Sequence, residues 1–129
     1  MKTAALVARL LLGLMFVVFG LNGFIHFLPM PPMPAGPAQE FMGALAATHY
    51  MHPVFAIQLI AGVLFLIGRY VPLALTLLGP VLVNILLFHA LMAPSGILPG
   101  AFATILWFVV FARYRGCFAG IFSASPELD

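Results

Sequence analysis

The sequence predicts an all-α protein, a transmembrane four-helix antiparallel bundle with a proline-rich first outer loop and a short interfacial helix. Composition is the first observation, because 64% of the 129 residues are hydrophobic and only 6% are charged. A soluble domain carries about 25% charged residues. The second observation is the presence of four apolar segments long enough to cross a bilayer. They cover about residues 4–28, 53–67, 71–92 and 97–112. We interpret residues 1–129 as a single integral membrane domain.

The first apolar segment follows Lys2, contains Arg9 and then stays apolar as far as Phe27. This stretch is longer than the apolar core of a signal peptide, which has about 7–15 residues, and no small-residue cleavage site follows it. We therefore expect a retained transmembrane helix.

The first connection is the longest and is rich in proline between Pro29 and Pro37. Proline interrupts helices, so this stretch is expected to be extended and stiff. Pro37 suits the first turn of a following helix. In the segment 38–49, Phe41 and Leu45 share one face with Thr48. The pattern predicts a short helix that lies at the membrane interface or dips back into the bundle.

The remaining three apolar segments are joined by very short connections, 68–72 and 93–96. Such connections force neighbouring helices to be antiparallel. The segment 53–67 is short for a membrane span, which favours local thinning of the bilayer or anchoring at its ends. The segment 71–92 contains Pro80, which removes a backbone donor and is expected to bend the helix.

All basic residues fall on one side of this four-span topology. They are Lys2, Arg9, Arg69, Arg113 and Arg115. Basic residues mark the cytoplasmic side of membrane proteins, so both termini are predicted to be cytoplasmic. For a bacterial source, the membrane is the inner (plasma) membrane and the proline-rich connection faces the periplasm.

The histidines fall on the opposite side from the basic residues. Ionisable residues at membrane depth tend to face a cavity or a partner, so we treat this group and the polar residues near it as candidate binding residues. Asn22 lies one helical turn from His26, whereas Asn84 and His89 are five residues apart and do not share a face. The complete candidate set is His26, His89, Asn22, Asn84, His49, His52, Gln58 and Glu40.

An imidazole beside an amide, near the interface and under apolar walls, can hydrogen-bond a quinone head group and supply protons to it. The alternative is structural, because a histidine at a helix end is often only an interfacial residue. Asn22, Asn84 and Gln58 would then be hydrogen-bonding groups between helices. His and Met ligands would suit Cu(I), but their spacing matches no strict ligand motif. We assign no metal ligand and no catalytic residue.

Several functional classes are excluded by the sequence. The single cysteine, Cys117, excludes an intrachain disulfide and dithiol exchange within the chain. There is no basic stripe with aromatic residues of the kind that binds nucleic acid. A phosphate-binding loop and a dinucleotide fingerprint are also absent.

Two stretches carry a resemblance to a known family. Residues 19–29 read FGLNGFIHFLP, and residues 68–74 read GRYVPLA before PVLVNILLFH at 80–89. Their order and spacing resemble those of DoxX and DoxX-like membrane proteins, over about residues 5–112. The resemblance implies a small four-helix bundle. Some relatives are membrane subunits of a thiosulfate–quinone oxidoreductase, and others belong to oxidative-stress complexes.

The resemblance carries over four polar positions, Asn22, His26, Asn84 and His89, without assigning their chemistry. We expect a redox-associated membrane subunit that binds a quinone or another apolar cofactor at the periplasmic-side interface. The alternative is a non-catalytic structural or assembly subunit of a larger membrane complex, and the sequence does not decide whether the chain is an enzyme. The expected partners are the lipid bilayer and either other membrane subunits or a second copy.

Overall fold

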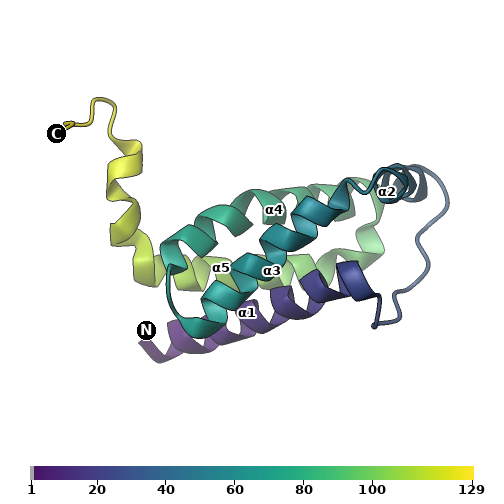
Figure 1. The fold of residues 1–129 in the computed structure, drawn as a ribbon, viewed down its shortest axis with the longest axis horizontal. Helices are drawn as coiled ribbons and strands as arrows, with labels where there is room; N and C mark the ends of the chain where they lie inside the picture. The colour runs from purple at the N-terminus through teal and green to yellow at the C-terminus, as the bar shows by residue number, and fades with distance from the viewer. Residues whose placement is uncertain (1) are drawn as a thin grey trace.

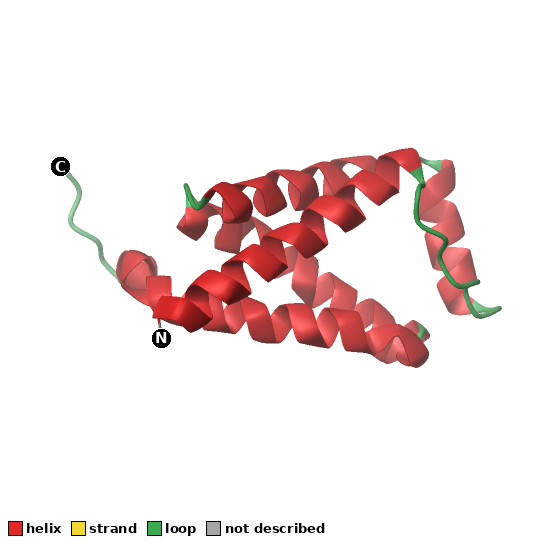
Figure 2. Cartoon of the chain, turned by 90° about the horizontal axis from the view of Figure 1, so that it is seen from below, coloured by secondary structure: helices red, strands yellow, loops and turns green. Residues whose placement is uncertain are grey.

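The computed structural model describes residues 2–129, and the regular structure within this range is entirely helical (Figure 2). Its α-helices and two short 3-10 helices are, in order, α1 (Lys2–Ile25), α2 (Pro37–Ala47), α3 (Met51–Ile67), α4 (Val71–Met92), η1 (Pro94–Gly96), α5 (Ile97–Tyr114) and η2 (Arg115–Phe122).

The four long helices α1, α3, α4 and α5 lie side by side (Figure 1). Helix α1 contacts α3 and α5, and α4 contacts the same two helices. The core between them is apolar, and its largest fully buried side chains are Phe65, Leu12, Leu75, Leu78, Val71 and Val110. Helix α2 lies across one end of the long helices, steeply inclined to them (Figure 2).

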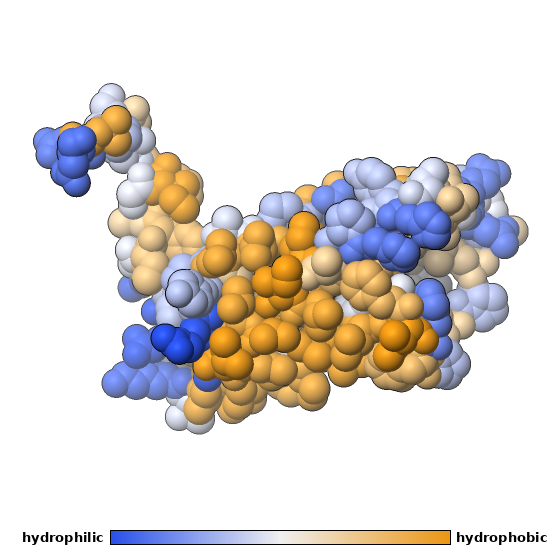
Figure 3. Space-filling view, in the orientation of Figure 1, coloured by the Kyte–Doolittle hydropathy of each residue, from blue (hydrophilic) through white to orange (hydrophobic). Residues whose placement is uncertain are grey.

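The outer faces of the long helices are also apolar. Leu91 and Leu98 are 75% and 76% exposed, and Figure 3 shows a continuous hydrophobic face over the middle of the molecule. Three segments are long and apolar enough to cross a membrane: Lys2–Ile25, Val71–Met92 and Pro94–Phe122. Helix α3 meets this test only together with α2, and the two are bent by 88°. These features indicate an all-helical membrane protein.

The helix boundaries agree with the prediction for 71–92 and differ at several other ends. Helix α1 ends at Ile25 rather than at 28 because His26 adopts a left-handed φ of 50°. Helix α2 ends at Ala47 rather than at 49 because His49 has a φ of 57°. Helix α3 begins at Met51, two residues early, because Pro53 is tolerated in the first turn of a helix.

Glycines allow α1 and α3 to approach closely. A Cβ atom added to Gly62 would lie 2.7 Å from the backbone N of Val17, and one added to Gly20 would lie 3.0 Å from the backbone N of Leu59. Close backbone approach at small residues is a common way for membrane helices to associate. This contact fixes the rotation of both helices and therefore the direction in which their polar side chains point.

Candidate functional site

The helix ends next to the histidines and those next to the basic residues lie on opposite sides of the molecule (Figure 1). We call the end that contains His26, His49, His52 and His89 the imidazole end. We call the end that contains Lys2, Arg9, Arg69, Arg113 and Arg115 the basic end. The separation of these groups along the helices agrees with the prediction.

His26 and Asn22 do not form the pair that their spacing predicts. His26 has a left-handed backbone and an exposed side chain. Asn22 is buried, and its Oδ1 accepts a hydrogen bond from the backbone N–H of Leu28 at 2.7 Å. Asn22 therefore stabilises the chain as it leaves α1. Histidine is one of the residues enriched in the left-handed conformation, which gives His26 a structural role at this helix end.

His49 and His52 do come together, at the junction of α2 and α3. Their ring centroids are 5.1 Å apart, and the ring of His52 is also 5.5 Å from that of Phe24 on α1. Phe55 extends the cluster, since its ring lies 6.2 Å from that of Phe24. A Cβ atom on Gly23 would meet the Phe55 ring at 2.3 Å, so only glycine leaves room for that ring. Both imidazoles are exposed.

His89 belongs to a second aromatic group, on α4. Its ring is partly buried and meets the Phe88 ring edge to face at 5.1 Å, and the Phe88 ring stacks on Phe41 of α2 at 6.0 Å. Nδ1 of His89 lies 2.9 Å from the carbonyl oxygen of Ile85. A carbonyl oxygen only accepts, so Nδ1 carries the proton and Nε2 is the acceptor of the neutral ring.

The three remaining candidates lie on separate helices and in different surroundings. Gln58 is buried on the face of α3 that also buries Ala61 and Phe65. Asn84 is exposed on α4, and its Nδ2 donates a hydrogen bond to the carbonyl oxygen of Pro80 at 2.9 Å. Glu40 is exposed in the first turn of α2, where its negative charge interacts favourably with the helix dipole.

The imidazole end therefore holds two aromatic–imidazole groups in place of one shared cluster. His49 and His52 form the first group and His89 belongs to the second, while His26 is a helix-end residue. Among residues 2–129, no three His, Cys, Asp or Glu side chains are grouped so that they could hold a metal ion. The residues at this end can offer hydrogen bonds and aromatic surfaces to a ligand.

The basic end has contacts that the sequence analysis did not anticipate. The sequence identifies Arg9 only as a marker of topology, but its Nη1 donates hydrogen bonds to the carbonyl oxygens of Phe65 and Leu66. These carbonyls belong to the last turn of α3, where no further helical N–H can reach them. The guanidinium also places positive charge at the negative end of the helix dipole. The close approach of Arg9 to Gly68 was not predictable from spacing.

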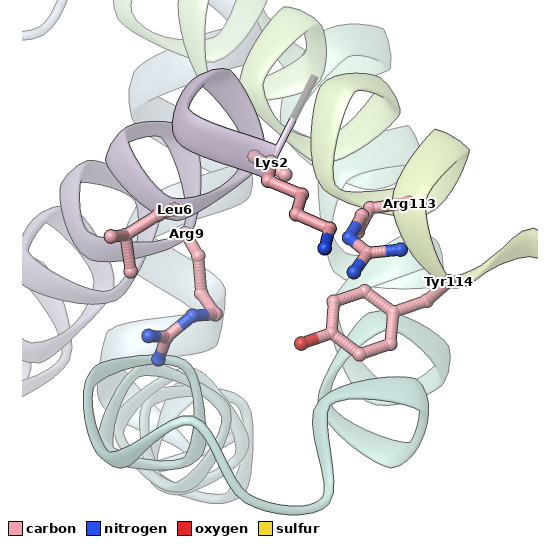
Figure 4. Close-up of a pocket in the computed structure, with 6 residues that line it drawn as sticks. Lys2, Leu6, Arg9, Arg113 and Tyr114 are labelled. Carbon is pink, nitrogen blue, oxygen red and sulfur yellow. The ribbon is translucent and has the colours of Figure 1, made fainter.

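Two pockets also lie at the basic end. One, of about 190 Å³, is lined by Lys2, Ala5, Leu6, Arg9, Arg113 and Tyr114 (Figure 4). The second, of about 330 Å³, is lined by Arg113, Tyr114, Gly116 and Cys117. Sequence reasoning missed this site because it treated the basic residues as a single marker of membrane side. The pocket could have been suspected from the sequence, because Lys2 and Arg9 lie near the start of the first helix and Arg113 near the end of the last.

Comparison with protein-family models, with curated proteins and with solved structures gave no match.

Proposed function

We propose that the chain is a DoxX-like membrane subunit that crosses the bilayer four times, through α1, α3, α4 and α5 as an antiparallel bundle. The apolar outer faces of these helices support this arrangement, with α2 lying at the interface. The grouping of basic residues at one end supports a cytoplasmic location for both termini in a bacterial inner membrane. Helix α3 has 17 residues, which is near the lower limit for a span.

We further propose that the imidazole end binds an apolar ring cofactor of the quinone type beside His89. One observation carries this proposal: the bond to Ile85 fixes the proton of His89 on Nδ1, which leaves Nε2 as an acceptor at the edge of the ring that borders Gly96 in the α4–α5 turn. A quinol hydroxyl is a matching donor. The rings of Phe88 and Phe41 supply the apolar surface that such a ligand requires.

The acceptor at Nε2 of His89 fits the hydroxyl of a quinol head group, and the pair His49 and His52 offers additional donors at the same end. A quinone bound there would provide the two-electron carrier that the chain's own residues lack, since its single cysteine cannot undergo dithiol exchange within the chain. His89 would hold a quinol and, on its oxidation, accept one of its two protons at Nε2, the other passing to water. The two electrons would pass to another subunit.

Retention of the quinol form of a 1,4-benzoquinone with a short side chain, by the purified protein in phosphatidylcholine nanodiscs under anaerobic conditions, tests this proposal. The amount retained per chain is measured from the ultraviolet spectrum of an organic extract. His89→Phe keeps an aromatic ring, removes the Nε2 acceptor and should lower retention at least about fivefold, the value of a lost hydrogen bond to a partly buried ligand. His26→Asn is the matched control, since asparagine also adopts the left-handed conformation.

Failure of the wild-type protein to retain the quinol above empty nanodiscs contradicts cofactor binding, as does equal retention by the two variants. Either result would favour a non-catalytic assembly subunit. A specific observation supports that second function: Asn84 presents a polar amide on an exposed face of α4, a helix long and apolar enough to cross a membrane. A polar side chain in such a position favours contact with another helix.

A further inference from the structure

The smaller pocket at the basic end joins the first and last helices of the chain. Lys2 and Arg9 belong to α1, whereas Arg113 and Tyr114 belong to the last turn of α5. Figure 4 shows the Lys2 ammonium beside the Arg113 guanidinium, with the Tyr114 hydroxyl directed into the space between α1 and α5. The pocket therefore depends on the folded arrangement of two segments that are more than a hundred residues apart.

The charge around this pocket is uncompensated. Three of its six lining residues are cationic, and no acidic side chain lines it. Of the three acidic residues in the sequence, Glu40 lies in α2 at the opposite end, and Glu127 and Asp129 are exposed in the tail after η2. Convergent cations repel one another, so a bound anion would stabilise the arrangement.

The donors fit a tetrahedral oxyanion better than a single point charge. The Arg113 guanidinium can donate two parallel hydrogen bonds to one phosphate, Lys2 adds a compact positive charge, and the Tyr114 hydroxyl can donate a further hydrogen bond. Arg9 keeps additional N–H groups besides those directed at α3. The apolar part of the lining, Ala5 and Leu6, continues into the exposed apolar face of α1.

We propose that this pocket binds the phosphate group of an anionic phosphate ester. A phospholipid fits it, because an acyl chain could follow the exposed Leu6 and Leu10 side chains, and a soluble phosphate compound has the same head-group chemistry. The proposal concerns the basic end alone and does not depend on cofactor binding at the imidazole end.

Native mass spectrometry of the full chain in detergent, titrated with phosphatidic acid or phosphatidylcholine, tests the proposal. The wild-type protein should bind one phosphatidic acid in preference to phosphatidylcholine. Arg113→Gln should weaken this binding at least about tenfold, because it removes a charge-assisted bidentate contact. Arg115→Gln removes the same charge two residues away, outside both pockets, and should change the affinity less than about twofold.

Tyr114→Phe keeps the ring and its packing and should weaken binding about threefold, through loss of one hydrogen bond. Displacement of the lipid by excess inorganic phosphate would identify a site for soluble phosphate, whereas resistance to displacement would identify a lipid site, and both outcomes support the shared chemistry. Equal weakening by Arg113→Gln and Arg115→Gln, or no preference of the wild-type protein for phosphatidic acid, would overturn the proposal.

Discussion

Polar side chains make mainly local hydrogen bonds at the imidazole end, whereas at the basic end they connect different helices. At the imidazole end, Asn22, Asn84 and His89 each form a hydrogen bond within their own helix or its immediate exit, and His26 and His49 end helices. At the basic end, cations from α1 and α5 converge on one pocket, and Arg9 bonds to a third helix.

This difference shows that side chains at the same level along the helices are not necessarily in contact. Residues at one membrane level share a depth, but the rotation of each helix decides whether their side chains meet. Convergence at the basic end arises because α1 and α5 are in direct contact. The histidines are distributed over α1, the α2–α3 junction and α4, so a common depth does not bring their side chains to one point.

The largest effect is expected at the basic end, from Arg9→Gln. This change leaves the Phe65 and Leu66 carbonyls without the guanidinium donor and should lower the free energy of unfolding by about 2 kcal/mol, the value of hydrogen bonds to a charged group. Denaturant unfolding in a single detergent measures the change. Arg69→Gln, at an exposed position in the α3–α4 turn, is the control of equal charge. Similar losses in both variants would mean that Arg9 acts only through net charge.

A smaller effect is expected at the imidazole end, from substitutions at His49. His49→Val should lower the free energy of unfolding by about 1–2 kcal/mol, because a β-branched residue is strained at a φ of 57°. His49→Asn should be nearly neutral, since asparagine tolerates this conformation. The same unfolding assay compares the two. If they cost the same, the imidazole itself stabilises the junction, and the structural interpretation of this residue is wrong.

Sequence reasoning predicted the all-helical membrane class and the bounds of α4, because a long, mostly apolar segment with a tight turn on each side defines a helix directly. It placed the ends of α1 and α2 too late, because hydropathy does not reveal the left-handed backbone conformation of His26 and His49. The pairing of His49 with His52 and the pocket at Arg113 depend on helix rotation, which is set by contacts such as that of Gly62 with Val17.

Both proposals require the two ends of the molecule to face opposite sides of a membrane. Cys117, the single cysteine, is exposed next to the basic end. Ser95 is exposed in the α4–α5 turn at the imidazole end, so Ser95→Cys in a Cys117→Ser background supplies the matching probe. Labelling of sealed right-side-out vesicles with a membrane-impermeant maleimide should modify the cysteine at 95 and leave native Cys117 unmodified until the membrane is opened. Modification of both positions from the same side would contradict the account.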